Sequence, residues 1–325
     1  MFKRVQHKLT QLPTPLAGLA LAIASLGWCW ENALPLQHYA KWSGALIAAC
    51  LLLSLAIKFV RFPRLLREDL AHPVVGSVVP TFAMGWMLVS SSIGQWQPAV
   101  GQAVWLGAIT LHLLFLGCFI HHRAKKFALH HMLPSWFVPP VGIIVADVAF
   151  PGGALQPLAD ALLQLGLACY AVMLPIMIYR LVFERDIPDP AKPTIAIMAA
   201  PASLCLAGYL TVTQEPSAMV VALLASIAVL MTAIIYVAFF SLLRLPFNPG
   251  YAAFTFPMVI GATALYKLAA QLTQWGMDSG SSQLIQHLAL AELLIATLVV
   301  GYVTLRYLLH YGRKPLGLVS DTAKS

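Results

Sequence analysis

The stretch Phe254-Thr255-Phe256-Pro257 lies near the start of an apolar segment over 250–273 and carries the only interior proline of that segment. Prolines recur at the same place in three earlier segments, at intervals of 60, 61 and 56 residues: Pro80, Pro140, Pro201 and Pro257. A second set opens these segments and an earlier one, at intervals of 60, 61, 59 and 56 residues: Pro13, Pro73, Pro134, Pro193 and Pro249. Because a fixed period dictates architecture, the chain is predicted to be five copies of one unit.

The composition is that of an integral membrane protein. Of 325 residues, 60% are apolar and 10% are charged, with a mean hydropathy of +0.80, whereas soluble domains carry about 25% charged residues. The apolar residues form blocks of roughly 20, the length that a helix needs to cross a hydrocarbon core. Strands of a membrane barrel would alternate polar and apolar residues, so helices are predicted.

Ten such segments divide the chain, and each unit of the repeat contains two of them. We expect spans near 14–30, 39–59, 74–93, 98–121, 133–151, 154–180, 191–213, 217–244, 250–273 and 281–309. They pair into five helical hairpins over 13–59, 73–121, 133–180, 191–244 and 249–309, within one transmembrane domain over 1–325.

Basic residues gather in alternate breaks between the segments. These breaks and the two ends of the chain hold 18 of the 20 Lys and Arg: Lys3, Arg4, Lys8, Lys58, Arg61, Arg64, Arg67, Arg123, Lys125, Lys126, Arg180, Arg185, Lys192, Arg244, Arg306, Arg313, Lys314 and Lys324. Such asymmetry predicts that both termini and the basic loops are cytoplasmic. It also accounts for the net charge of +8 by contact with anionic lipid, without nucleic acid.

The interior prolines favour a central passage. Each removes a backbone hydrogen bond and kinks its helix, and the freed carbonyls must be buried in protein or face water. The odd-numbered segments are therefore expected inside, around a common axis, with the even ones outside. The residues before the prolines, or their counterpart in the first repeat, are expected to line the passage: Leu19, Val79, Pro139, Ala200 and Phe256, beside Pro80, Pro140, Pro201 and Pro257. Phe256 is the one large side chain and would occlude the passage; packing between helices is the alternative.

Charged residues inside the segments are few. No ring of Asp or Glu marks a cation pore. Asp147 and Glu292 each occur once, which fits interhelical hydrogen bonding as well as proton transport. Lys267 fits snorkelling to the interface or attraction of anions. The half-helix after each interior proline presents its positive end, and together these features favour anions.

Catalytic and metal-binding patterns are missing from the sequence. There is no HExxH, GxSxG or pair of intramembrane aspartates. His121-His122 and His130-His131 flank a basic loop, but no Cys or acid completes a ligand set. The five cysteines lie in apolar blocks without CxxC spacing. We expect no enzyme, no metal site and no cofactor.

Several short motifs resemble the tellurite-resistance/dicarboxylate transporter family, which includes the plant slow anion channels and fungal malate permeases. They are Leu12-Pro13-Thr14 with Gly18, His72-Pro73-Val74, Leu133-Pro134-Ser135 with Pro139-Pro140, Ala200-Pro201-Ala202, and Phe254-Thr255-Phe256-Pro257. The resemblance implies ten helices in a pseudo-five-fold ring, one pore per subunit, a homotrimer, and a gating phenylalanine that matches Phe256. Pro257 stands where the bacterial tellurite-resistance pattern has glycine, and the first repeat has no interior proline.

The sequence therefore predicts a gated channel in a bacterial cytoplasmic membrane for small anions such as chloride, nitrate or a malate-like dicarboxylate. The alternative is a proton-coupled C4-dicarboxylate carrier or a tellurite-resistance transporter, in which Asp147 or Glu292 would carry protons.

Overall fold

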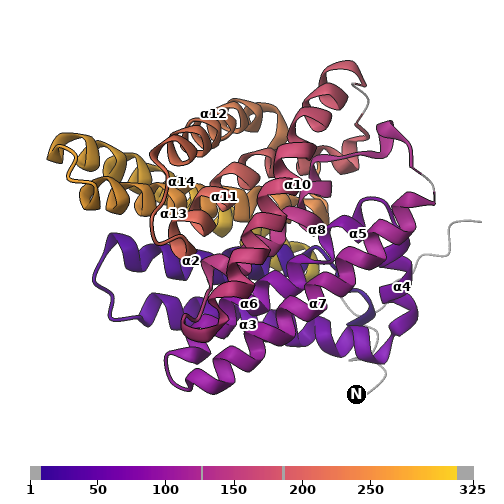
Figure 1. The fold of residues 1–325 in the computed structure, drawn as a ribbon. Helices are drawn as coiled ribbons and strands as arrows, with labels where there is room; N and C mark the ends of the chain where they lie inside the picture. The colour runs from indigo at the N-terminus through magenta and orange to yellow at the C-terminus, as the bar shows by residue number, and fades with distance from the viewer. Residues whose placement is uncertain (1–8, 126, 185–186, 313–325) are drawn as a thin grey trace, which may run out of the picture.

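The computed structural model describes residues 9–125, 127–184 and 187–312, and within these ranges every regular element is helical. Eight helical stretches are long and apolar enough to cross a membrane: α3 (Tyr39–Arg61), Val75–Gly94, α7 (Pro98–Ala124), Gly153–Phe183, Asp189–Val212, α12 (Ala218–Leu242), Pro249–Gln274 and α14 (Ser279–Gly312). They run mostly along one direction, between the end that carries α4 (Pro63–Ala71) and the end with the α2–α3 and α13–α14 turns (Figure 1).

Two shorter segments lie where the first and fifth spans are expected. One is α2 (Leu16–Ala33). The other, Pro134–Val148, is broken into η2 (Pro134–Phe137), α8 (Val138–Val141), η3 (Gly142–Ile144) and α9 (Val145–Val148). Two adjacent prolines, Pro139 and Pro140, prevent a regular hydrogen-bond ladder here, because neither has an N–H to donate.

Odd and even spans differ sharply in burial. In the most apolar stretch of Val75–Gly94, Asp189–Val212 and Pro249–Gln274, 78% to 83% of the residues are buried, whereas the other five spans have 28% to 39%. The even helices present large apolar side chains outward, among them Val60, Val237, Phe240 and Leu298. Apolar side chains turned outward on helices of this length face lipid, so the odd spans form the interior, as predicted.

The interior elements pack against one another as well as against their own hairpin partners. Within hairpins, α2 contacts α3, α6 (Thr81–Gly94) contacts α7, α11 (Ala200–Val212) contacts α12, and α13 (Thr255–Gln274) contacts α14. Between hairpins, α2 contacts α6 and α13, α11 contacts α9 and α13, and α6 contacts α9. The core of the molecule therefore lies among the odd segments.

The interior prolines mark junctions between two helical pieces. Pro80 separates α5 (Val75–Val78) from α6, Pro201 follows the 3-10 helix η5 (Asp189–Ala199) at the start of α11, and Pro257 lies in the first turn of α13, after η6 (Pro249–Phe254). The sequence predicts continuous helices with a kink at each proline. The structure instead has a short helical segment followed by a separate α-helix. Proline is tolerated in a first turn because the N–H that it lacks has no intrahelical partner there.

One element escaped the sequence prediction. The basic break after the second segment contains α4, which follows α3 directly and begins with Pro63. Its sequence, Pro-Arg-Leu-Leu-Arg-Glu-Asp-Leu-Ala, is too short and too charged to span a membrane. The loop is therefore a surface helix at the basic end.

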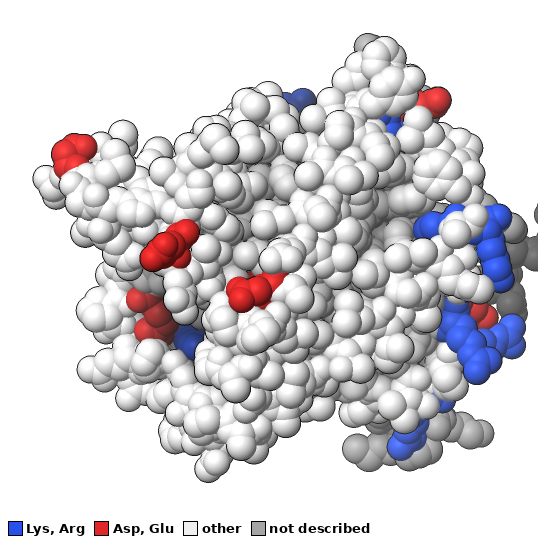
Figure 2. Space-filling model, in the orientation of Figure 1, with Lys and Arg blue, Asp and Glu red and all other residues white. Residues whose placement is uncertain are grey.

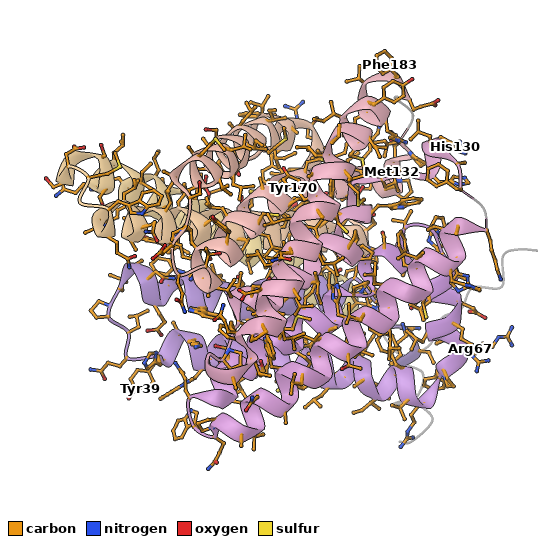
Figure 3. All side chains as sticks on the ribbon, in the orientation of Figure 1. Tyr39, Arg67, His130, Met132, Tyr170 and Phe183 are labelled. Atoms are coloured by element: carbon orange, nitrogen blue, oxygen red, sulfur yellow. The ribbon has the colours of Figure 1, made fainter. Side chains whose placement is uncertain are left out.

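Charge separates the two ends of the molecule. Figure 2 shows Lys and Arg gathered at the end that carries α4, and Asp and Glu exposed mainly toward the opposite end. Arg67 and His130 lie at the first end and Tyr39 at the other (Figure 3). Eight of the basic residues cited above lie outside the described residues: Lys3, Arg4, Lys8, Lys126, Arg185, Arg313, Lys314 and Lys324.

Candidate functional site

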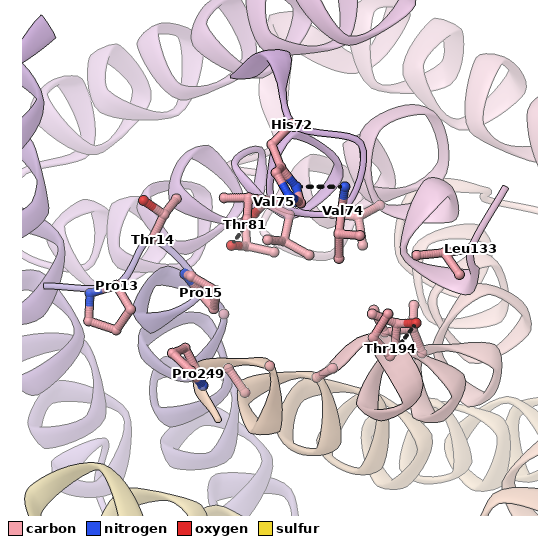
Figure 4. Close-up of a pocket in the computed structure, with 18 of the residues that line it drawn as sticks. Pro13, Thr14, Pro15, His72, Val74, Val75, Thr81, Leu133, Thr194 and Pro249 are labelled. Atoms are coloured by element: carbon pink, nitrogen blue, oxygen red, sulfur yellow. Dashed lines mark hydrogen bonds between the residues drawn. The ribbon is translucent and has the colours of Figure 1, made fainter. Parts of the chain in front are cut away.

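A cavity of about 1360 Å³ opens at the basic end, and each of the five hairpins contributes to its wall. In Figure 4, Pro13, Thr14 and Pro15 of the first hairpin lie across the space from Leu133 and Thr194 of the third and fourth. His72, Val74, Val75 and Thr81 of the second hairpin lie between these two groups, and Pro249 of the fifth lies beside Pro15. The starts of the five predicted repeats thus all contribute to the wall of one cavity.

The mouth of this cavity holds a charge pair. The buried Lys58 ammonium donates to the Leu12 carbonyl at 2.9 Å and lies 3.7 Å from an Asp69 carboxylate oxygen. The Thr14 hydroxyl donates to the same oxygen at 2.5 Å. This contact ties α3, α4 and the start of the first hairpin together, and leaves little net charge at that point of the mouth.

The His72 side chain, which also lines the cavity, caps the start of α5. Its Nδ1 accepts from the amides of Val74 and Val75 at 3.2 and 3.1 Å. The imidazole therefore satisfies two donors at the start of α5, which helices otherwise leave without an intrahelical partner. The motif His72-Pro73-Val74 thus has a local structural role beside the cavity.

The deep end of the cavity is lined by the starts of the fresh α-helices. Ala200 and Pro201 of α11, Phe256 and Pro257 of α13, and Thr81 of α6 all contribute. Because the N-terminal turns of helices carry partial positive charge, this end of the cavity suits an anion. Phe256 is 8% exposed and is much larger than Ala200 or Gly18, which also line the wall.

The cavity wall contains some of the predicted lining residues and replaces others. Phe256, Ala200, Pro201 and Pro257 belong to it. Leu19, Val79, Pro80, Pro139 and Pro140 are not among its lining residues; their places are taken by Gly18, Leu21, Val78, Thr81, Val138 and Val141. The proline spacing carries no signal for this shift, because the helical register that turns one residue inward and its neighbour outward is set by packing against adjacent helices.

The charged residues singled out within the spans lie apart from this cavity. Asp147, in α9, is fully buried, and neither of its carboxylate oxygens has a hydrogen-bond partner among the described residues. Glu292, in α14, is half-buried, and its Oε2 packs against Gly261 of α13, where an added Cβ would lie 2.6 Å away. Lys267 is half-buried near the opposite end of α13. The fold thus brings neither acid to the mouth or to Phe256.

Metal ligands are not clustered in the described part of the chain. No group of three His, Cys, Asp or Glu side chains in the described ranges has an arrangement that could hold a metal ion. His130 and His131 line the cavity, and Figure 3 shows His130 at the basic end of the molecule. The wall of the cavity is mostly apolar, and Phe137 and Phe256 contribute aromatic rings to it.

A protein family matches most of this chain, and individual known proteins resemble parts of it. The family model described as voltage-dependent anion channel, SLAC1, matches residues 12–308. Two uncharacterized transporters of Methanocaldococcus jannaschii are 27% and 28% identical over 166 and 165 residues, 45% of this chain and 46% of each relative. The tellurite resistance protein TehA homolog of Haemophilus influenzae is 23% identical over 216 residues, 62% of this chain and 65% of that protein. The matches thus span less than two thirds of each relative's length.

Proposed function

Because the chain belongs to the SLAC1 family of voltage-dependent anion channels, we propose that it is a transmembrane channel for small anions, occluded by Phe256. The chain is a multi-pass membrane protein of a transporter and channel family. The observation that carries the proposal is the position of Phe256, at the deep end of a cavity walled by all five hairpins.

The architecture we propose is a ring of five hairpins around one passage. The contacts α2 with α6, α6 with α9, α9 with α11, α11 with α13 and α13 with α2 form a closed circuit, which supports this arrangement. The high burial of the odd spans supports it as well. The helix starts that meet at the cavity offer positive dipole ends without a fixed countercharge, which suits ions that must leave again.

Chloride, nitrate and a malate-like dicarboxylate are the anions we propose. The basic end would face the cytoplasm of a bacterial cell, its arginines and lysines against anionic lipid. A homotrimer, with one passage in each subunit, completes the proposal; the apolar outer faces of the even helices are available for lipid and for the other copies.

Removal of the Phe256 ring tests the gate. Phe256→Ala should raise the single-channel conductance of protein reconstituted into a planar bilayer on the order of tenfold, a barrier change of about 1.4 kcal/mol. Phe256→Leu should give an intermediate value. Phe254→Leu is the matched control, because Phe254 is fully buried and packs on Phe239 and Tyr251 with ring centroids 5.5 and 4.8 Å away, outside the cavity wall. Equal conductance of wild type and Phe256→Ala, with intact folding, would remove Phe256 from the gate.

Asp147 favours a second candidate, a proton-coupled carrier for dicarboxylates. A buried carboxyl group without a hydrogen-bond partner is costly, and acids inside membranes commonly serve in proton transfer. In this case uptake of malate into proteoliposomes saturates, follows a pH gradient and is lost in Asp147→Asn or Glu292→Gln. A single-channel current far above carrier turnover, unchanged in both variants, decides for the channel. Tellurite resistance is named for the Haemophilus influenzae relative and is tested by growth on tellurite.

A further inference from the structure

One face of α13 continues beyond Phe256 as a polar stripe. At 100° per residue, Thr263, Lys267, Gln271 and Gln274 fall within about 60° of the direction of Phe256 around the helix axis. Val259, Ile260 and Ala270 are the apolar side chains in the same sector. Lys267 stands eleven residues after Phe256, or about 16.5 Å along the helix at about 1.5 Å per residue. A side chain that shares the direction of Phe256 thus lies nearer the opposite end of the molecule.

Burial changes along this stripe. Phe256, Ile260 and Thr263 are 8%, 1% and 8% exposed. Lys267 and Gln271 are half-buried, and Gln274 is exposed. Exposure therefore begins at Lys267 and widens toward the end away from the basic loops, as expected for a passage that opens outward.

The stripe lies on the side of α13 that faces the interior of the molecule and not the lipid. The outer helix α14 packs on the other side of α13: Glu292 meets Gly261 there, and the Ser282 hydroxyl donates to the Ala269 carbonyl at 3.1 Å. Gly261 and Ala269 each lie about 140° around the helix from Phe256. Because α2 and α11 also contact α13, Lys267 lies on the side of α13 that is turned away from these contacts with α14.

Lys267 carries a charge without a local counterion. In the described ranges, no acid lies within ion-pair distance of its ammonium and no side chain hydrogen-bonds to it. A cation within a membrane helix is costly unless it is paired or meets water. An anion in a water-filled passage would supply both the water and the countercharge.

We infer that Lys267 lines the half of the passage beyond Phe256 and is an anion-binding residue there. The inference rests on the proposed channel function and extends it with a specific residue. Anions that pass the Phe256 ring would meet this ammonium before they leave at the end opposite the basic loops. The polar side chains of Thr263 and Gln271 flank it along the same face.

The charge is tested in a Phe256→Ala background, where the passage is open. At about 0.05 M salt, Lys267→Gln should reduce the chloride conductance about threefold and lower the chloride-over-potassium permeability ratio, while Lys267→Arg retains both. At 1 M salt the difference should vanish, because the Debye length falls to about 3 Å.

Lys41→Gln is the matched control. Lys41 is a buried cation at the same end of the molecule, but it belongs to the outer helix α3 and stacks on Trp28, with its ammonium 4.4 Å from the ring centroid. Its removal should leave conductance unchanged at both salt concentrations. Equal conductance of Lys267→Gln and its parent at low salt would overturn the inference.

Accessibility supplies a readout that does not depend on conduction. In proteoliposomes, Lys267→Cys should react with a membrane-impermeant anionic thiol reagent added on the side opposite the basic loops, above the signal of the unsubstituted protein. Absence of that reaction overturns the placement of Lys267 in the passage. Absence of current in Phe256→Ala, with normal labelling of Lys267→Cys, would instead count against the proposed channel and leave the placement intact.

Discussion

Gly27 and Gly44 let the two helices of the first hairpin approach at backbone distance. A Cβ added to Gly27 would lie 2.2 Å from the Ala40 carbonyl oxygen and 3.2 Å from the Gly44 Cα. Helices in membranes pack through small residues at such points, because lipid gives them no hydrophobic reason to associate. The repeat therefore depends at this point on two residues that carry no side chain.

We predict that Gly27→Ala lowers the free energy of unfolding by about 1–3 kcal/mol, because backbone must move to admit the methyl group. The measurement is the thermal midpoint of the detergent-solubilised protein. Gly117→Ala, in α7, is the control: its added Cβ meets nothing within 4 Å, and alanine is the better helix former. A midpoint that falls equally in both variants contradicts the close approach.

The short helix α4 shows how an element outside the membrane is held over the cavity. Asp69 of α4 contacts Lys58 and Thr14. At the end of α4, the Arg123 guanidinium of α7 donates to the Ala71 carbonyl at 2.5 Å. Side-chain exposure is 6% for Lys58 and 25% for Asp69. Removing one partner of such a pair leaves the other charge partly desolvated, which costs more than the pair itself contributes.

Asp69→Asn should therefore destabilise the protein by about 1–3 kcal/mol, and Lys58→Met in the same chain should restore part of the loss. Protease cleavage within 63–71 measures the release of α4. Additive losses in the double variant would show that the two side chains do not interact. Arg64→Ala serves as the control, because its pair with Glu68 is exposed on both sides, at 90% and 56%, and contributes little.

The uneven distribution of charge between the two ends of the molecule predicts its orientation in the membrane. Basic residues mark one end (Figure 2), and the proposed orientation places that end in the cytoplasm. We predict that Asp278→Cys, in the α13–α14 turn, reacts with an impermeant thiol reagent in intact cells, whereas Arg64→Cys reacts only after permeabilisation. The reverse pattern would invert the orientation. Unsubstituted protein gives the background from Cys50 and Cys118, which are exposed on the protomer.

The oligomeric state of the protein is also testable. The proposed homotrimer predicts a protein mass of about three times 35.2 kDa for the detergent complex, measured by light scattering with the detergent contribution subtracted. A monomer in mild detergent and in nanodiscs would contradict it. The conductance of Phe256→Ala should then show three equal levels, one for each passage.

The sequence by itself determined much of this protein. Block length and hydropathy identified membrane helices, and the interior prolines predicted which spans lie inside. The motifs around Pro13, Pro201 and Phe256 identified the family. The proline period predicts a repeat of five units, which stays a prediction. These features are local or periodic, and bilayer thickness and proline chemistry act on them directly. The sequence did not predict the loop helix α4 or the 3-10 helices that precede α11 and α13.

Only the tertiary structure decided which residue at each proline faces the cavity. Val78 and Thr81, and not Val79 and Pro80, belong to the wall, together with Phe256 and Ala200. It also separated Asp147 and Glu292 from the cavity, whereas helical periodicity alone places Lys267 on the same side of α13 as Phe256. The rotation of a helix about its axis follows from contacts with neighbours far away in the chain, such as Glu292 against Gly261, and proline spacing carries no information about those contacts.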